Sequence, residues 1–421
     1  MTEFNQAASP FSSAGRGVGS TAAAAESTAN RQRAERVMRR DGLQALVATT
    51  PENVGYVIGS QLRATNWTMQ IYAVLPADPT ARPRLIIPTN RLGVVAQIGL
   101  TTADLYLYSD FFLEGSPEGR ASTPDVDAFY ALLQTAHTYA GPLEALNAAL
   151  HDLGVGQAAV GIDEMRISPS VYAQFEAGRP ERSVIRAYAL FREIRQVKTP
   201  VEIRRLREAA ILNERLEREL IGLIREGVHE EEIAAHYRRG IVSAGAVPAM
   251  VAVGAGPRSA LPLIERYFRR IEQGDLVRFD LCSHLDGYWA DTGRTAVLGE
   301  ADEWQTKHFA AVYAGWETAL EQVRPGVQAS EIFEAAVGRV RGSGIPHYRR
   351  QHVGHAIGLE LYDDIVLGPS DHRVLEEGMV FCVEVPYYEL GAGGFQIEDT
   401  VVVTPDGYEF LTGMPRVLYR Q

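Results

Sequence analysis

The fold is decided by the stretch Leu276-Val277-Arg278-Phe279-Asp280-Leu281-Cys282, which continues through Asp286-Gly287 to Tyr288-Trp289-Ala290-Asp291. Two apolar runs joined by Asp-Gly predict a β-hairpin, although the sequence alone does not fix the length of its turn. A register centred between Leu285 and Asp286 would place Asp280 directly opposite Asp291, with Cβ atoms about 4.5 to 5.5 Å apart. Two bare carboxylates at that distance repel each other.

The same construction recurs near the C-terminus. The runs 380–386 and 395–403 flank a turn that contains three glycines, and a register centred on Gly391 places Glu384 opposite Glu398. Buried carboxylates are protonated, paired with bases or bound to metal, and basic residues are scarce in these four strands. The two acidic pairs therefore predict a bound cation.

Between the hairpins lies Gly354-His355-Ala356-Ile357-Gly358, a histidine held between small residues. An imidazole combined with carboxylates suits Mn, Co, Fe or Zn, whereas an all-oxygen set would suit Mg or Ca better. Four carboxylates and one histidine can hold two ions if some carboxylates bridge. A single histidine or a single acidic pair is more often structural, so the prediction depends on the whole set.

Length and composition favour a two-domain globular protein. The chain has 421 residues, of which 46% are hydrophobic and 22% charged. Its net charge of -12 disfavours nucleic acid as a main partner. No apolar run is long enough to span a membrane and no secretory signal is evident, so we expect a cytoplasmic protein without a membrane partner. Residues 1–28, rich in Ala, Ser, Gly and Thr, are expected to form a disordered tail.

Strand-like and helix-like segments alternate in the first half of the chain, which predicts an α/β domain over residues 29–185. The expected helices are 31–41 and 126–139, the expected strands are 43–47, 68–75, 83–87 and 105–108, and Pro51-Glu52-Asn53 is expected to be a turn. Thr199-Pro200 provides a helix start before the apolar periodicity of 203–225. Further helices are predicted at 230–244, 304–323 and 330–341, within a second domain over 190–421.

Several of these motifs together resemble the creatinase, prolidase and aminopeptidase P superfamily. The matching segments are Pro51-Glu52-Asn53-Val54-Gly55-Tyr56, Arg195 to Ile203, Gly274 to Asp280, Gly287 to Thr295, the Gly-His-x-Ile-Gly segment at His355, and Ile397-Glu398-Asp399-Thr400. The resemblance covers the chain from about residue 31 to its end. It implies a creatinase-like N-terminal α/β domain followed by a catalytic domain with the pita-bread fold.

By this resemblance the metal ligands are Asp280, Asp291, His355, Glu384 and Glu398, with Asp291 and Glu398 bridging two divalent ions. Mn is the first expectation for the metal, with Co, Zn or Fe as alternatives. Glu384 would also handle the proton of the attacking water. The implied activity is hydrolysis of an amide bond in a small peptide, similar to Xaa-Pro dipeptidase or aminopeptidase P, in a homodimer.

The surroundings of the site depart from the family pattern. Leu263, Gln351 and Tyr362 occupy positions where the peptidases usually have histidines, and Gln396 stands where an arginine is often found. We expect His352 and Tyr362 to act as catalytic substitutes beside Glu384. His347 and His284 are weaker candidates, for which a surface-loop position is favoured.

These departures keep two other functions open. One is changed chemistry, such as an amidohydrolase or lyase acting on a small non-peptide metabolite. The less favoured one is a catalytically inactive binding protein, which would lack stoichiometric metal.

Two cysteines accompany the expected ligands. Cys282 follows Asp280 by two residues and Cys382 precedes Glu384 by two, so strand alternation places each thiol on the face of its ligand. They could line the metal pocket, but a small buried hydrophobic role is favoured.

Overall fold

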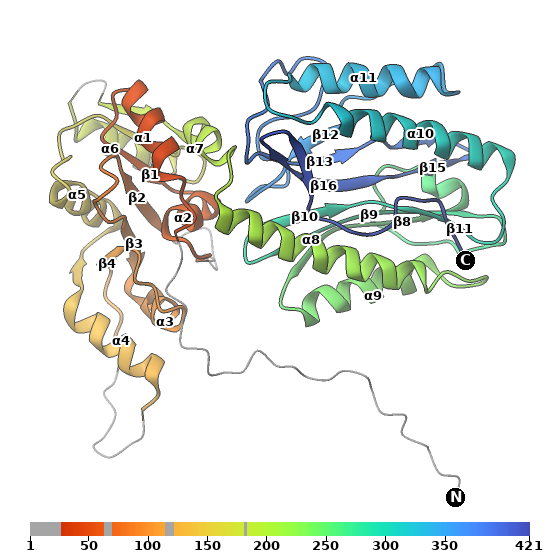
Figure 1. Ribbon diagram of the computed structural model, residues 1–421. Helices are drawn as coiled ribbons and strands as arrows, with labels where there is room; N and C mark the ends of the chain where they lie inside the picture. Colours follow the sequence, from red (N-terminus) through yellow and green to blue (C-terminus); the bar gives the residue numbers. More distant parts are fainter. Residues whose placement is uncertain (1–26, 63–69, 114–121, 181–182) are drawn as a thin grey trace, which may run out of the picture.

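The computed structural model describes residues 27–62, 70–113, 122–180 and 183–421. Residues 1–26 of the predicted tail, and the beginning of the strand predicted at 68–75, lie outside these ranges. Two lobes are connected through α7 (Tyr188–Arg195) and the start of α8 (Pro200–Ile221), as Figure 1 shows. No helix within the described ranges combines the length and the apolar character that crossing a bilayer requires.

The N-terminal lobe is built on a mixed seven-stranded sheet with the order β5-β4-β3-β2-β1-β6-β7. Its strands are β1 (Ala45–Ala48), β2 (Tyr72–Pro76), β3 (Arg84–Pro88), β4 (Asp104–Tyr108), β5 (His137–Tyr139), β6 (Val160–Ile162) and β7 (Val184–Arg186). Alternate side chains of β1 enter different cores, Leu46 on one face and Val47 on the other. Both faces are buried, which explains why the strand is apolar throughout.

Helices cover both faces of this sheet. On one side lie α1 (Arg31–Arg40), α2 (Pro51–Ile58) and α3 (Leu92–Gln97), and on the other α5 (Pro142–Asp152) and α6 (Pro169–Ala177). The predicted α/β organisation of this lobe is therefore confirmed. The turn predicted at Pro51-Glu52-Asn53 is wrong, because Thr50 caps a helix there by accepting a hydrogen bond from the Asn53 amide, and Pro51 occupies the first helical position.

The helix predicted at 126–139 is also partly wrong. The helix α4 spans Pro124–Thr135, and His137–Tyr139 form the edge strand β5 beside β4. Aromatic and β-branched residues in this short segment favour a strand once a neighbouring edge is available for pairing.

The C-terminal lobe places two sheets between two pairs of helices (Figure 1). The first sheet contains β8 (Val247–Ala255), β9 (Leu276–Leu285), β10 (Tyr288–Thr292), β11 (Thr295–Val297) and β18 (Tyr419–Arg420). The second contains β12 (Gly354–Ala356), β13 (Val380–Glu384), β16 (Glu398–Thr404) and β17 (Gly407–Phe410), and the ribbon β14 (Tyr387–Glu389) with β15 (Gly393–Phe395) extends it.

Each sheet of this lobe has its own helical cover. The helices α8 and α9 (Glu230–Ser243) share a core with the first sheet, and α10 (Glu303–Gln322) and α11 (Ala329–Gly342) share one with the second. The four predicted helices of this domain agree with these bounds within a few residues. The domain limits of 29–185 and 190–421 remain a prediction.

Candidate metal centre

The first acidic hairpin has a tight two-residue turn. Leu285 pairs with Tyr288, and the turn residues Asp286 and Gly287 have φ values of 49° and 87°. Two positive φ angles match the twist of the flanking strands in a turn of this length. In this register Asp291 pairs with Cys282, so the prediction that Asp280 lies directly opposite Asp291 is wrong. The two aspartates are diagonal neighbours instead.

The second hairpin has the predicted register. Glu384 on β13 pairs with Glu398 on β16, and Tyr387 pairs with Phe395 further along the same ribbon. Gly391, at the tip, has a φ of 89°, which an L-residue with a side chain rarely adopts. The facing glutamates predicted from the sequence are therefore confirmed.

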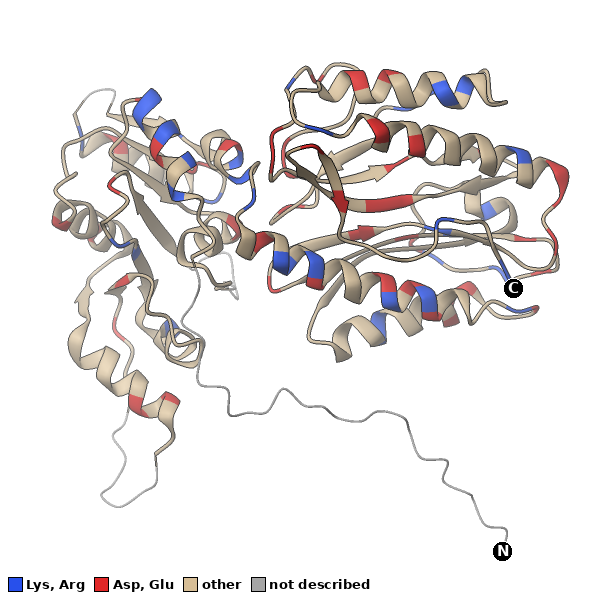
Figure 2. Cartoon of the chain, in the orientation of Figure 1, with Lys and Arg blue, Asp and Glu red and all other residues tan. Residues whose placement is uncertain are grey.

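Backbone contacts bring the two hairpins and the histidine together. The Glu398 amide donates to the Gly293 carbonyl at 3.0 Å, which connects the end of β10 to the start of β16. His355 on β12 pairs with Cys382 on the neighbouring β13. The five expected ligands, Asp280, Asp291, His355, Glu384 and Glu398, are all buried. Figure 2 shows acidic positions on the strands between the helix layers of this lobe.

A cavity of about 470 Å³ opens onto this cluster. The four carboxylates line it together with His352, Tyr362, Leu263 and Gln351. Three of the residues that differ from the pattern of the resembled family, Leu263, Gln351 and Tyr362, thus line the same cavity as the carboxylates. The residues that differ from the family pattern therefore lie at the candidate metal site and not on a remote surface.

The orientation of His355 leaves one ring nitrogen directed at the acidic cluster. Its Nδ1 is 3.2 Å from the Ala356 carbonyl oxygen, and its Nε2 is 3.7 Å from Asp291 Oδ2. A backbone acceptor at Nδ1 fixes the tautomer that leaves Nε2 free to bind a metal. The ring of Tyr362 stacks on the imidazole with centroids 3.9 Å apart.

The carboxylates are electrostatically strained without a cation. Burial, followed by the charge of Asp291, raises the pKa of Asp280 to about 7. Burial and the neighbouring carboxylates also raise the pKa of Glu398 well above its ordinary value. Removal of water and mutual repulsion disfavour the charged forms, and a bound cation reverses both effects.

The donor atoms fit a metal centre. One group, Asp280, Cys282 and Asp291, and another, His355, Cys382 and Glu398, each have ligand atoms within 4.8 Å of one another. Imidazole nitrogen and carboxylate oxygen are donors that borderline divalent ions accept. The residues present therefore fit the metal that the sequence predicts.

Glutamine and arginine side chains hold the acidic groups in place. Gln396 Nε2 donates to Glu384 Oε2 at 3.1 Å and to Glu398 Oε2 at 3.2 Å. Arg278 Nη1 donates to Asp280 Oδ2 at 3.2 Å from within β9. The sequence analysis missed Arg278, although strand alternation places a residue two positions before Asp280 on the same face.

A polar chain leads from Glu384 to the cavity mouth. His352 Nδ1 is 3.2 Å from Glu384 Oε1, and His352 Nε2 is 3.4 Å from the Tyr362 hydroxyl. Burial lowers the pKa of His352, so its ring is neutral near pH 7. Of the three residues predicted as catalytic, His352 therefore contacts both Glu384 and Tyr362.

Other candidates lie outside the cavity. His347 contacts the Tyr387 hydroxyl at 3.0 Å, and His284 packs on Trp289 with ring centroids 5.2 Å apart.

The two cysteines contact Asp291 but do not line the cavity. Cys282 Sγ is 3.1 Å from Asp291 Oδ1, and Cys382 Sγ is 3.8 Å from the Asp291 carbonyl oxygen. Both are fully buried, as expected for small hydrophobic side chains.

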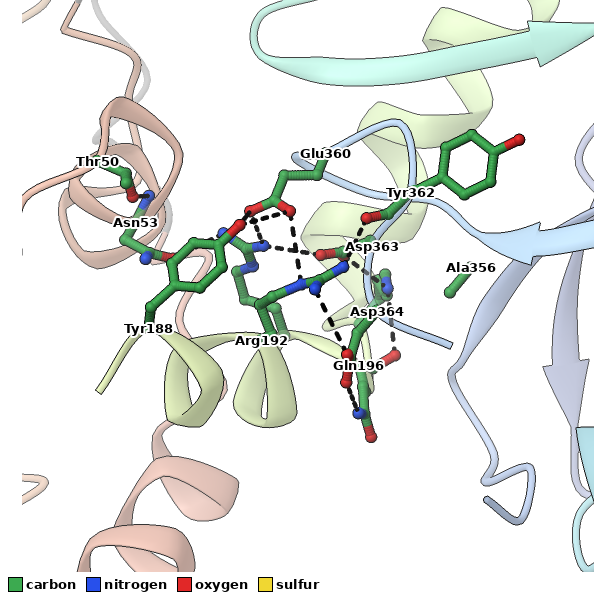
Figure 3. A network of polar contacts seen from close by, with 12 residues as sticks. Thr50, Asn53, Tyr188, Arg192, Gln196, Ala356, Glu360, Tyr362, Asp363 and Asp364 are labelled. Atoms are coloured by element: carbon green, nitrogen blue, oxygen red, sulfur yellow. Dashed lines mark hydrogen bonds and ion pairs between the residues drawn. The ribbon is translucent and has the colours of Figure 1, made fainter. Parts of the chain in front are cut away.

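The loop that carries Tyr362 is attached to the linker between the lobes (Figure 3). Arg192 Nη2 donates to the Tyr362 carbonyl oxygen at 2.7 Å, and the Tyr188 hydroxyl donates to Glu360 at 3.0 Å. Arg195 Nη2 donates to Asp363 Oδ1 at 2.8 Å, and Nη1 reaches Asn53 of the N-terminal lobe. The position of Tyr362 therefore depends on residues far away in the sequence.

Comparisons with known proteins agree with this architecture. A model of metallopeptidase family M24 matches residues 204–405, and a model of the creatinase/prolidase N-terminal domain matches residues 30–197. A probable dipeptidase PepE of Mycobacterium tuberculosis is 29% identical over 388 residues, covering 90% of this chain and 92% of the relative. An Xaa-Pro dipeptidase of Pyrococcus furiosus is 34% identical over 231 residues, which is 54% of this chain and 66% of the relative.

A solved structure has the same fold. The Xaa-Pro dipeptidase from Bacillus anthracis superposes with a TM-score of 0.75 at 22% identity, covering 93% of this chain and 99% of that one. The chain belongs to the creatinase, prolidase and aminopeptidase P superfamily, and its C-terminal lobe is a family M24 domain with the pita-bread fold. It is a metallopeptidase-type hydrolase, and M24 metallopeptidases use divalent metal ions.

Proposed function

We propose that this protein is a dinuclear metal-dependent hydrolase that cleaves the amide bond of small peptides of the Xaa-Pro dipeptide type. The observation that supports the proposal is the group of four buried carboxylates that line a single cavity, with the buried His355 directing its Nε2 at one of them, Asp291, from 3.7 Å. The proposed ligands are Asp280, Asp291, His355, Glu384 and Glu398. We take Asp291 and Glu398 as the bridging pair. Asp291 is grouped with Asp280 and also lies 3.7 Å from His355 Nε2, and Glu398 is grouped with His355 and also faces Glu384 across the hairpin.

The bound ions would lower the pKa of a water and polarise the substrate carbonyl. Glu384 is the proposed proton acceptor for that water, because its carboxylate lines the cavity and its Oε1 lies 3.2 Å from His352 Nδ1. Tyr362 contributes a hydroxyl donor at the cavity mouth, at a distance of 3.4 Å from His352 Nε2. A donor in that position can stabilise the oxyanion that develops on the substrate.

A small peptide substrate is supported by two observations. The cavity of about 470 Å³ lies in the size range of small-molecule sites. A relative that aligns over 90% of this chain is named as a probable dipeptidase, and one that aligns over 54% of it is named as an Xaa-Pro dipeptidase. Mn is our first proposal for the native metal, with Co, Zn or Fe as alternatives. We also propose a cytoplasmic homodimer, which equilibrium sedimentation of the purified chain would test.

The direct experiment is hydrolysis of a panel of Xaa-Pro dipeptides and tripeptides after loading with Mn, Co or Zn. Glu384→Gln is expected to abolish turnover, whereas Glu389→Gln, a matched change on the same ribbon, is expected to retain it. Complete inactivity of the metal-loaded wild type on the panel would contradict the peptidase proposal. It would favour the alternative of amidohydrolase or lyase chemistry on a small non-peptide metabolite, for which the altered wall at Leu263 and Gln351 is the specific observation.

A further inference from the structure

The register of the first acidic hairpin places a thiol against one of the proposed bridging ligands. Cys282 on β9 pairs directly with Asp291 on β10, and its Sγ is 3.1 Å from Asp291 Oδ1. Cys282 is 0% exposed and Asp291 is 4% exposed, so bulk water hardly competes for this contact. A thiol is a weaker acid than a carboxyl group, so the proton lies on sulfur and Cys282 donates a hydrogen bond to the carboxylate.

The Asp291 carboxylate differs from its neighbours in the kind of donor that it has. Side-chain nitrogens donate to the other three proposed carboxylate ligands, Asp280, Glu384 and Glu398. At Asp291 the nearest such nitrogen is His355 Nε2 at 3.7 Å, and it carries no proton in the tautomer that the Ala356 carbonyl fixes. Within the described part of the chain, the thiol of Cys282 is therefore the side-chain donor to Asp291.

The surroundings of Cys282 do not fit a purely hydrophobic role. None of the four apolar cores formed by the described residues includes it, whereas the other thiol, Cys382, belongs to one of them. Across the neighbouring strand, β8 has a bulge in which Ala249 and Met250 lie opposite Cys282. Bulges are frequent next to active sites, and Met250 lines the cavity here. Cys282 thus lies beside the candidate metal site and not inside a core.

The two oxygens of the Asp291 carboxylate face different groups. Oδ1 faces the thiol, and ligand atoms of Asp280, Cys282 and Asp291 lie within 4.8 Å of one another. Oδ2 faces His355 Nε2, which belongs to the group that also contains Glu398. A carboxylate that bridges two ions directs one oxygen at each, and each oxygen has a second lone pair for a hydrogen bond. The thiol can therefore fix the rotation of this carboxylate and still leave both oxygens available.

We propose that Cys282 is a positioning residue for the metal centre, whose thiol donates to Asp291 Oδ1 and holds this carboxylate in the orientation that binds both ions. The inference rests on the dinuclear site of the proposed function and adds the group that orients one of its ligands. The thiol keeps its proton and is not itself a ligand. Hydrogen bonds that orient a metal ligand are commonly worth about 10- to 100-fold in metal affinity.

The test measures the affinity of the full-length protein for Mn by competition with a chelator, which requires no turnover. Cys282→Ala keeps a small apolar side chain but removes the donor, and Mn is expected to bind about 10- to 100-fold more weakly. Cys282→Ser replaces the thiol by a hydroxyl donor, and its affinity is expected to stay within about threefold of wild type.

Cys382→Ala is the matched control, because its buried thiol packs in an apolar core and is 3.8 Å from the Asp291 carbonyl oxygen. Its Mn affinity is expected to stay within about threefold of wild type. Equal weakening in Cys282→Ala and Cys282→Ser, or wild-type affinity in Cys282→Ala, would overturn the proposal, because a packing role does not distinguish a donor from a non-donor.

A second arm records the optical spectrum of the Co-loaded protein, in which a thiolate ligand produces a sulfur-to-cobalt charge-transfer band. We expect no such band. A band that disappears in Cys282→Ala would show that the thiol binds the metal directly, and it would also overturn the proposal.

The infrared S–H stretching band separates this inference from the proposed function, because it is measured on metal-free protein. The chain has two cysteines, so Cys382→Ala retains the band of Cys282, and Cys282→Ser retains that of Cys382. The Cys282 band is expected at the lower frequency, because a hydrogen bond to a carboxylate weakens the S–H bond. If wild type binds no divalent ion, the proposed function fails, and this band still decides whether Cys282 donates to Asp291. A Cys282 band at or above the frequency of the Cys382 band would refute the inference.

Discussion

Asp363 neutralises two buried cations at the junction of the two lobes, and its replacement by alanine is expected to destabilise the protein strongly. Its Oδ1 accepts a hydrogen bond from Arg195 at 2.8 Å, and its Oδ2 accepts one from Lys198 at 3.1 Å. The side chains of all three residues are 1% exposed. Asp363 directly follows Tyr362 in the same loop, and Figure 3 shows the polar network that surrounds it.

The magnitude follows from the partners that remain in Asp363→Ala. Arg195 keeps Asn53 at 2.7 Å and Glu360 at 2.6 Å, but among the residues that the structure describes Lys198 keeps only the Gln196 carbonyl at 3.3 Å. Removing one member of a buried ion pair costs about 3 to 5 kcal/mol, because the other charge stays buried and unpaired. Since that charge is mainly Lys198, the added change Lys198→Met is expected to recover about half of the loss.

Calorimetry and urea unfolding measure this effect. A loss of this size lowers the melting temperature of a domain of this length by on the order of 10 °C. The matched control is Glu409→Ala, which breaks an exposed ion pair with Arg207 at 2.7 Å and is expected to cost less than about 1 kcal/mol. A loss below about 1 kcal/mol in Asp363→Ala, or no recovery in the double variant, would refute the reasoning.

The pH dependence provides an independent check on Asp363. Burial alone would raise its pKa, but the charges of Lys198 and Arg195 outweigh burial and hold the pKa below its ordinary value. A depressed folded-state pKa contributes stability above the unfolded value near pH 4, and this stability is lost as the pH falls through the folded value. Wild type should therefore lose more stability below pH 4 than Asp363→Ala does.

Three further predictions concern the site and its support. Asp291→Ala or Glu398→Ala is expected to abolish activity and metal loading together, as assayed by turnover and elemental analysis, and retained turnover in either variant would contradict the bridging role. Tyr362→Phe removes the hydroxyl next to His352, so kcat should fall about tenfold with metal content unchanged; an unaltered kcat would exclude a substrate contact. Burial raises the pKa of Glu217 to about 7, so its contribution to stability is present below about pH 4.5 and is lost as the pH rises through 7. Wild type should lose on the order of 3 kcal/mol in its free energy of unfolding by urea between pH 5 and 8, and Glu217→Gln should remove that loss. If the variant has the same pH profile as wild type, the pKa of Glu217 is not raised in the folded protein.

The hairpin at Glu384 and Glu398 could be predicted from the sequence because local turn chemistry and strand alternation determine its register. The same reasoning predicted the wrong cross-strand partner for Asp291, which pairs with Cys282 and not with Asp280. The alternation of apolar residues does not determine the length of the turn at Asp286-Gly287. Positive φ angles at both turn residues reveal the two-residue loop. Local patterns therefore predict the acidic pairs, and the structure is needed for their exact register.

Other features depend on contacts between distant parts of the chain. No pattern near Arg195 indicates that it contacts both Asn53 and Asp363, which are 142 and 168 residues away. The contacts of Arg350 are equally nonlocal, because Glu384 lies on β13 and Tyr388 on the ribbon that follows it. Propensity and periodicity describe neighbours in the sequence and carry little information about such tertiary contacts.

The metal content of the purified protein tests the central claim most directly. Elemental analysis after loading with Mn, Co or Zn and removal of excess ion gives the number of ions bound per chain. Two ions per chain, lost together with activity on treatment with a chelator and restored by adding metal back, are predicted by the five converging side chains. A folded, active preparation that holds no divalent ion and is unaffected by chelators would contradict the account.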